Sequence, residues 1–182
     1  SYKEKGQASE AEKVVKYREA LVEMDDTEKS PLGDREGALI SIQTKLDAVE
    51  KLKEDGKTGW QSVANDAFKP LEELLWAGID SIAALSYVEK ARALYILERY
   101  SDALQILTGE KTAAIINGFD EGYKKERIES QAPSVFATFI EGRIYQAQAA
   151  KASSDEEKIK LNGKAVKKFY SLLLKHEKFP KY

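Results

Sequence analysis

The sequence has no cysteine and only one histidine, His176, among its 182 residues. The missing cysteines exclude disulfides, thiolate-bound zinc, iron–sulfur clusters and a cysteine nucleophile. A single histidine excludes multi-histidine metal sites and argues against proton-shuttle chemistry. No run of about 18 apolar residues is present, and residues 1–12 are polar and charged, so neither a membrane span nor an uncleaved secretory signal is expected.

The composition is that of a globular domain. Hydrophobic residues make up 42% of the chain and charged residues 33%, with 29 Lys and Arg against 31 Asp and Glu. This supplies one core of the size found in roughly 100–200 residues, so residues 1–182 are expected to form a single domain. Because the chain starts at Ser1 and stops just past a helix-like run, we expect it to be a piece of a longer protein. The sequence does not identify the cellular compartment, and a bacterial periplasmic or other extracytoplasmic location is a hypothesis.

Apolar residues recur at helical spacing along the first third of the chain. The first stripe comprises Val14, Tyr17, Leu21 and Met24. It follows a Ser9–Glu12 capping box and ends before a break around Pro31 and Gly33. The second stripe comprises Leu39, Ile42, Leu46, Val49 and Leu52. Together they predict an antiparallel helical hairpin over residues 1–56.

The rest of the chain also has helical patterns. A Thr58–Gln61 capping box predicts a helix start, and Pro70 predicts a bend or break because proline removes a helical hydrogen bond. Further helices are predicted from Asp80 or Ser81 to about Arg99, from Ser101 to about Thr108, from Pro133 to about Ala152, and from a Ser154–Glu157 capping box to about Lys175. Residues 110–130 are poorly patterned and predict one short helix within a loop.

No strand is predicted, because the Asn117-Gly118 and Asn162-Gly163 pairs lack alternating apolar flanks. The fold class is therefore all-α. Helices of these lengths with short links form either a stack of antiparallel hairpins or an irregular helical bundle, and periodicity alone does not separate the two.

Residues 84–107 combine aromatic and small residues at helical spacing. Tyr87, Ala91 and Leu94 lie on one predicted helix, and Tyr100 with Ala103 forms a Tyr-x-x-Ala turn. The segment resembles a tetratricopeptide repeat, whose family pairs two antiparallel helices and stacks the pairs into a right-handed superhelix. In that family the small residue, here Ala91, allows the paired helices to approach closely.

A second, irregular match spans residues 138–180. Its residues are Gly142 at the small crossing position, then Tyr145, Ala165, Phe169 and a closing Phe179-Pro180. The small positions are 142 − 91 = 51 residues apart, where the family repeats at about 34. The resemblance implies tetratricopeptide-like hairpins within residues 57–182, with a lengthened turn at residues 151–163.

The resemblance also implies a concave groove that binds a peptide or protein. The family's groove positions fall on Leu85, Val88, Arg92, Tyr95, Phe136, Phe139, Arg143 and Gln146. Arg92 and Arg143 occupy equivalent sites in the two segments. Because a guanidinium binds a carboxylate through two parallel hydrogen bonds, the pair is predicted to hold an acidic side chain or chain terminus of a peptide. The alternative for each arginine is a solvated position or a pairing with a nearby Glu.

Charge is uneven along the chain. Residues 158–182 contain eight Lys and one acid, Glu177, for a charge of +7, which leaves −2 − 7 = −9 on the other 157 residues. This basic end is interpreted as either a solvated lysine face or a contact surface for an acidic partner, an anionic membrane or a phosphate backbone. No aromatic interleaving or nucleic-acid motif accompanies it, so no nucleic-acid partner is expected.

No catalytic constellation is found. His176-Glu177 starts like a zinc-protease helix, but its partner position is Pro180, and Glu110 interrupts the only phosphate-loop-like segment. Trp60 and Trp76 are predicted to be core anchors. We therefore expect a noncatalytic interaction scaffold without a metal or cofactor, with a possible acidic partner. The alternative is a helical ligand-binding or regulatory domain of a larger protein. The oligomeric state stays open.

Overall fold

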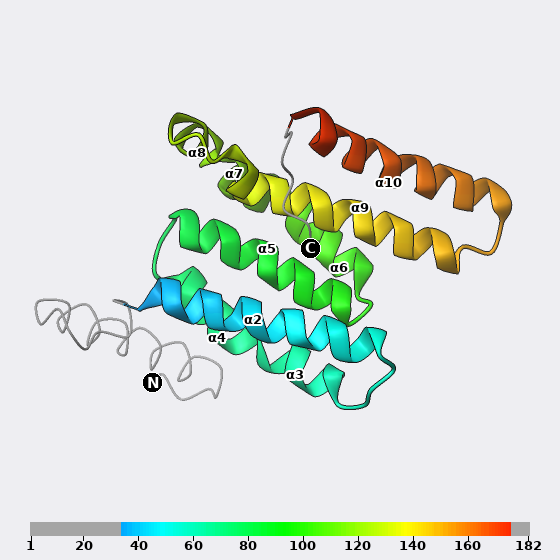
Figure 1. Ribbon diagram of the computed structural model, residues 1–182, viewed down its shortest axis with the longest axis horizontal. Helices are drawn as coiled ribbons and strands as arrows, with labels where there is room; N and C mark the ends of the chain where they lie inside the picture. The colour runs from blue at the N-terminus through cyan, green and yellow to red at the C-terminus, as the bar shows by residue number, and fades with distance from the viewer. Residues whose placement is uncertain (1–33, 176–182) are drawn as a thin grey trace, which may run out of the picture.

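The computed structural model describes residues 34–175, and this part of the chain consists of helices and the turns between them (Figure 1). The helices are α2 (Arg35–Glu54), α3 (Trp60–Asp66), α4 (Phe68–Trp76), α5 (Ser81–Ile96), α6 (Tyr100–Thr108), α7 (Glu110–Asn117), α8 (Asp120–Lys125), the 3-10 turn η1 (Glu129–Gln131), α9 (Pro133–Lys151) and α10 (Asp155–Lys175). The all-α prediction is confirmed over these residues. The predicted helix at residues 10–24 with its Ser9–Glu12 capping box, as well as His176, Phe179 and Pro180, lies outside them.

α2 forms because its apolar residues recur along one side of a helix. The residues buried on that side are Leu39, Ile42, Leu46 and Val49. Leu52, the last residue of the predicted stripe, is 36% exposed. The helix ends at Glu54, and Gly56 then turns the chain with a φ of 66°, a left-handed conformation that glycine adopts without a steric penalty.

α3 and α4 are separated by a break, as Pro70 predicts. α3 ends at Asp66 and α4 begins at Phe68, which puts Pro70 in the first turn of α4. The proline ring would clash with the carbonyl four residues earlier, and that carbonyl belongs to Asp66. A continuous helix through this segment is therefore excluded.

The start of α3 differs from the prediction. The N-cap residue is Gly59, and no side chain caps the helix, so the predicted Thr58–Gln61 capping box is wrong. The chain enters α3 through Gly59 in the left-handed region, at a φ of 87°. This conformation places the glycine, rather than Thr58, next to the first helical turn.

Of the two predicted starts of α5, Asp80 and Ser81, Asp80 provides the capping side chain. Asp80 Oδ1 accepts a hydrogen bond of 2.8 Å from the backbone N–H of Ala83. Arg35, the first residue of α2, donates to both carboxylate oxygens of Asp80 and also to the carbonyl of Leu74 at 3.0 Å. Asp80 therefore fixes both the start of α5 and its position beside α2.

Residues 110–130 are more helical than predicted. They form α7, α8 and η1, where the sequence suggests a single short helix within a loop. Ile116 anchors α7 in a core shared with α5, α6 and α9. α8 has no buried residue, so no apolar periodicity marks it in the sequence.

α9 and α10 form a close antiparallel hairpin. Only residues 152–154 connect them, so the lengthened turn predicted at residues 151–163 is wrong. α9 starts at Pro133, which suits the first helical position, and the N–H of Glu157 donates to Ser154 Oγ at 3.2 Å at the start of α10. The helices cross at Gly142. A Cβ atom at this position would lie only 2.5 Å from the ring of Phe169, so the approach requires glycine.

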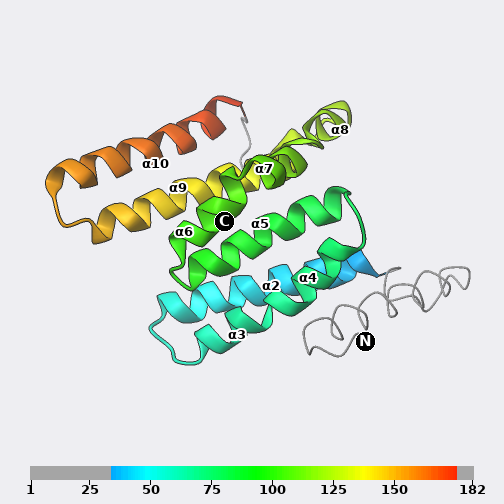
Figure 2. The ribbon, with the colours of Figure 1, turned by 180° about the vertical axis from the view of Figure 1, so that it is seen from behind.

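Seven of the helices form three antiparallel pairs in chain order, and α7, α8 and η1 connect the second pair to the third. α2, α5 and α9 lie side by side and run in the same direction, and α3–α4, α6 and α10 return in the opposite direction (Figures 1 and 2). The predicted division at residues 56 and 57 falls in the turn between α2 and α3, which pack against each other.

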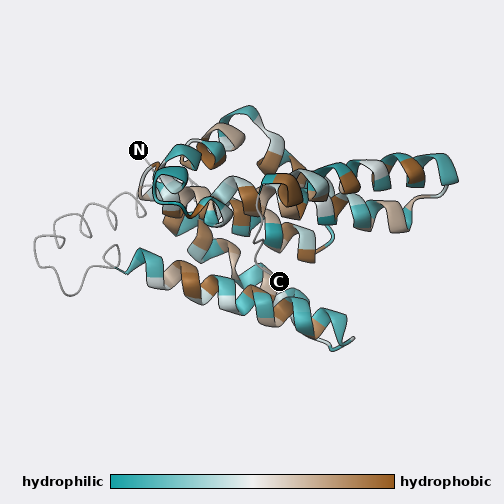
Figure 3. Ribbon diagram, turned by 45° about the horizontal axis from the view of Figure 1, so that its top comes forward, coloured by the Kyte–Doolittle hydropathy of each residue, from teal (hydrophilic) through white to brown (hydrophobic). Residues whose placement is uncertain are grey.

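The helices bury apolar residues in connected clusters. One cluster joins α2, α3, α4 and α5, and a second joins α5, α6, α7 and α9. Hydrophobic and hydrophilic segments alternate along the helices accordingly (Figure 3). Trp60 is partly buried against the first cluster, whereas Trp76 is 45% exposed, so the prediction that Trp76 is a core anchor is wrong.

Candidate functional site

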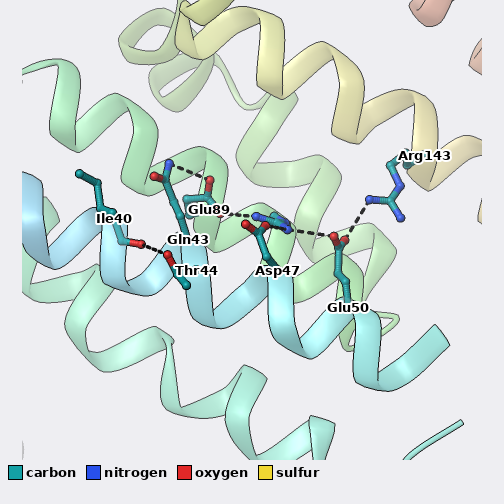
Figure 4. Close-up of polar contacts among 8 residues, drawn as sticks. Ile40, Gln43, Thr44, Asp47, Glu50, Glu89 and Arg143 are labelled. Atoms are coloured by element: carbon teal, nitrogen blue, oxygen red, sulfur yellow. Dashed lines mark hydrogen bonds and ion pairs between the residues drawn. The ribbon is translucent and has the colours of Figure 1, made fainter. Parts of the chain in front are cut away.

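The side of the molecule where α2, α5 and α9 lie next to one another carries a row of polar side chains, and we call it the α2–α5–α9 face. Gln43, Asp47, Glu50 and Lys53 are spaced four, three and three residues apart, so they project from one side of α2. Figure 4 shows the first three of them directed toward α5. Each side chain of the row bonds to α5 or to the turn that follows it.

Arg92 lies at the centre of this row. It is only 8% exposed, and its guanidinium binds Asp47, Glu50 Oε2 at 2.9 Å and Glu89 Oε2 at 3.4 Å. Burial alone would lower the pKa of Arg92, but the nearby charges of Glu89 and Glu50 raise it above its usual range. Arg92 is therefore a charged group that ties α2 to α5.

Glu89 is the most deeply buried acid of the network. Burial raises the pKa of Glu89 above its usual value, although Arg92 and a 3.2 Å hydrogen bond donated by Gln43 Nε2 act in the opposite direction. The ionised carboxylate is thus held at a desolvation cost that Arg92 offsets only in part.

Arg143 extends the network to α9. Its Nη1 binds Glu50 Oε1 at 3.0 Å, and its guanidinium carbon lies 4.9 Å from the centre of the Tyr95 ring. Glu50 therefore bridges two arginines on two different helices, while α2 and α9 are 93 residues apart in sequence at this contact. A stacked, bidentate-capable guanidinium suits such a position better than an ammonium group.

A second bridge joins the ends of the same three helices. Lys53 donates to the carbonyl of Ile96 at 2.6 Å and pairs with Glu98 at 3.2 Å, and Glu98 also binds Lys151 at the end of α9. Hydrogen bonds from Lys151 and Lys53 lower the pKa of Glu98. Glu98 adopts a φ of 62°, unusual for a residue other than glycine, and this turn aims its carboxylate at both lysines.

A small cleft opens between these groups. Its lining comprises Glu50, Glu89, Arg92, Phe136, Phe139, Ile140 and Arg143. Its volume of about 20 Å³ has room for roughly one water molecule. Sites for small organic ligands are an order of magnitude larger, so the cleft does not enclose such a ligand.

The structure brings together four of the eight residues predicted for the groove. Arg92, Phe136, Phe139 and Arg143 all line the cleft. Tyr95 lies beneath Arg143, and Gln146 is exposed one turn further along α9.

The other two predicted residues lie elsewhere. Val88 is 1% exposed and belongs to the hydrophobic core, and Leu85 packs against the cluster formed with α2. The reason is that α5 has neighbours on several sides, including α2, α4, α6, α7 and α9. Little of its surface is left to line a groove.

The sequence offers a nearby Glu as the alternative partner of each arginine, and Glu89, three residues before Arg92, is such a partner. The sequence does not identify the acids of α2. Asp47, Glu50 and Glu89 are partners of Arg92, and two of them come from a helix more than 40 residues away. The available signal was the polar spacing of Gln43, Asp47 and Glu50 beside the apolar stripe of α2. It indicates a polar edge without revealing which helix lies opposite.

Metal and membrane features are not apparent in the part of the chain that the structure describes. Within residues 34–175, no group of three or more His, Cys, Asp and Glu side chains is placed to hold a metal ion. No helix in that range is both long and apolar enough to cross a bilayer.

Comparison with known proteins provides no family for this chain. No protein-family model matches it, and neither a curated protein nor a solved structure shows significant similarity to it.

Proposed function

We propose that this protein is a noncatalytic scaffold of tetratricopeptide-like helical hairpins that binds a protein or peptide on the α2–α5–α9 face. The observation that carries the proposal is the convergence of Arg92, Phe136, Phe139 and Arg143. The sequence predicts these residues as groove positions in two separate segments, and they line one cleft.

The helix crossings support the repeat interpretation. Ala91 is fully buried on α5 among residues of α6, and Gly142 lies against the Phe169 ring of α10. Both small residues belong to the first helix of an antiparallel pair, which is where the tetratricopeptide family places them. At Gly142 even a Cβ atom would clash with Phe169 of the second helix.

The size of the cleft favours a partner that lies across the surface. A volume of about 20 Å³ accommodates no organic ligand, whereas a peptide or a protein surface needs no enclosed cavity. This observation gives no support to the alternative of a small-ligand domain.

The charge network supports one position for the proposed acidic contact. Arg92 is buried and already bound to three carboxylates of its own chain, so Arg143, which is more exposed, is the accessible arginine. A partner carboxylate would compete with Glu50 for Arg143. We therefore place the acidic contact at Arg143 and the neighbouring Gln146, at the exposed end of the cleft.

Site-specific photo-crosslinking tests the proposal. A photoreactive amino acid at Gln146 is compared with the same residue at Gln105, an exposed position on α6, in extracts of the source organism. We expect a discrete crosslinked protein from position 146 that is absent from position 105 and is lost when Arg143→Glu is added. Equal crosslinking at the two positions, or crosslinking indifferent to Arg143→Glu, would contradict the proposal. Circular dichroism of each variant checks that the helices are retained.

A further inference from the structure

α10 has two apolar faces, although α9 is its one extensive helix contact in the described part of the chain. Ala165, Phe169 and Leu172 face α9. A second stripe is exposed, with Ile159 at 73%, Val166 at 64%, Tyr170 at 59% and Leu173 at 67%. Gly163 completes this stripe, and the five positions follow one another at four, three, four and three residues. This is the spacing of a helix-to-helix seam.

Gly163 has no role within the described structure. A Cβ atom there would meet nothing within 4 Å, whereas at Gly142 it would meet Phe169. Glycine in a helix interior costs about 1 kcal/mol relative to alanine. In this molecule the other mid-helix glycine of the hairpin serves a close helix approach. We therefore interpret Gly163 as the hollow that receives a side chain from outside.

The edge of the hollow is basic. A shallow depression around Gly163 is lined by Lys160, Lys164, Lys167, Val166 and Tyr170. Residues 158–175 contain six lysines and no acid. Lys160 and Lys167 directly follow the stripe residues Ile159 and Val166, which puts them in the flanking positions that form salt bridges between paired helices.

The packing of the other pairs shows what such a second face does. α4 packs on α2 and also on α5, the first helix of the next pair, and α6 packs on α5 and also on α9. Each of these returning helices thus contacts the first helix of its own pair and the first helix of the next pair. α10 is the returning helix of the third pair, and its second face has the chemistry for a helix.

We propose that the outer stripe of α10 is a docking surface for an amphipathic α-helix of another protein, one with Glu or Asp beside its apolar seam and a large apolar side chain over Gly163. The surface is distinct from the α2–α5–α9 face. Pairing with α10 of a second copy is disfavoured because it would oppose two lysine-rich helices. The lysines would attract an anionic lipid surface, but such a surface has no side chain that would fit the depression at Gly163.

The probe is a three-heptad helical peptide with Ile and Leu in its seam and Glu in its flanking positions, compared with a twin that carries Lys in place of Glu. Binding to the full chain is measured by fluorescence anisotropy. We expect the acidic peptide to bind and its basic twin not to bind. Binding should weaken as salt rises.

Variants locate the binding to the stripe. Val166→Glu and Gly163→Leu should each lower the affinity for the acidic peptide by about tenfold or more. Lys160→Glu combined with Lys167→Glu should make the chain prefer the basic peptide over the acidic one. Lys124→Glu, on the exposed α8, is the matched charge control and should change little. Because all these positions are exposed or open, circular dichroism should show the same helix content throughout.

Three results would overturn the proposal. The first is failure of the acidic peptide to bind, or binding that is indifferent to Val166→Glu. The second is binding to phosphatidylcholine vesicles containing phosphatidylglycerol that Val166→Glu abolishes while the peptide does not bind, which would assign the stripe to a membrane. The third is concentration-dependent self-association in sedimentation velocity that Val166→Glu abolishes, which would assign it to a second copy.

Discussion

Gly142→Ala is the substitution that tests the α9–α10 crossing most sharply. A Cβ atom at position 142 would lie 2.5, 2.8 and 3.0 Å from three carbon atoms along one edge of the Phe169 ring. The ring also packs against Phe139 at a centroid distance of 5.8 Å, so its withdrawal would disturb a second contact. Either the ring leaves its position or the two helices separate.

Two opposing effects set the size of the change. Replacing glycine by alanine within a helix stabilises it by about 1 kcal/mol. Overpacking a closely packed contact costs about 1–3 kcal/mol. The net effect on the free energy of unfolding is a loss of up to about 2 kcal/mol. Gly163→Ala, on the other helix of the same hairpin, should give the same gain in helix stability without a steric clash, because no atom lies within 4 Å of the added Cβ. It should stabilise the protein by up to about 1 kcal/mol.

Urea unfolding followed by circular dichroism measures both variants against the wild type. We expect the two substitutions to move the free energy of unfolding in opposite directions. Adding Phe169→Leu to Gly142→Ala should restore part of the loss, because it removes the clashing ring edge. Equal stabilisation by Gly142→Ala and Gly163→Ala would refute the close crossing.

Three further predictions concern the charged groups and are checked by urea unfolding. Glu50→Gln should lower the free energy of unfolding by about 2–4 kcal/mol because it leaves two arginines short of a partner. Asp47→Asn, at a side chain 61% exposed, should lower it by at most about 1 kcal/mol. Equal losses would contradict the bridging role of Glu50. Burial raises the pKa of Asp80, but the hydrogen bond from Arg35 and those from the backbone lower it overall, so its stabilising contribution is present above its unfolded pKa of about 3.9 and is lost as the pH falls through its folded pKa. Asp80→Asn should therefore reduce the loss of unfolding free energy at acidic pH. An unchanged dependence on acidic pH would contradict the lowered pKa of Asp80. Burial raises the pKa of Glu89, so its contribution is present below its unfolded pKa and is lost as the pH rises through its folded pKa. Glu89→Gln should remove that loss, and identical profiles for variant and wild type would show that Glu89 titrates normally.

Much of the fold follows from local rules. The spacing of the apolar residues of α2 marks that helix, and Pro70 and Pro133 mark a break and a start through the missing N–H of proline. The two main differences also have local causes. Gly59 takes a left-handed conformation that displaces the expected cap at α3, and α8 buries nothing that would produce a pattern.

The site was less predictable, because its energetics come from contacts between distant segments. The sequence identifies Arg92 and Arg143 as equivalent positions in two similar segments. It does not identify Glu50 as the acid between them, since Glu50 lies 42 and 93 residues from these partners. Burial of Arg92 likewise depends on α2 lying over α5, and no local pattern encodes that packing.

The account depends on α2, α5 and α9 sharing one face, and a double-mutant cycle on Glu50 and Arg143 tests this most directly. Free energies of unfolding are measured for the wild type, Glu50→Gln, Arg143→Gln and the double variant. Because the two side chains meet at 3.0 Å across α2 and α9, we predict a favourable coupling of about 1 kcal/mol or more. Additive effects of the two substitutions would contradict the shared face and the binding site built on it.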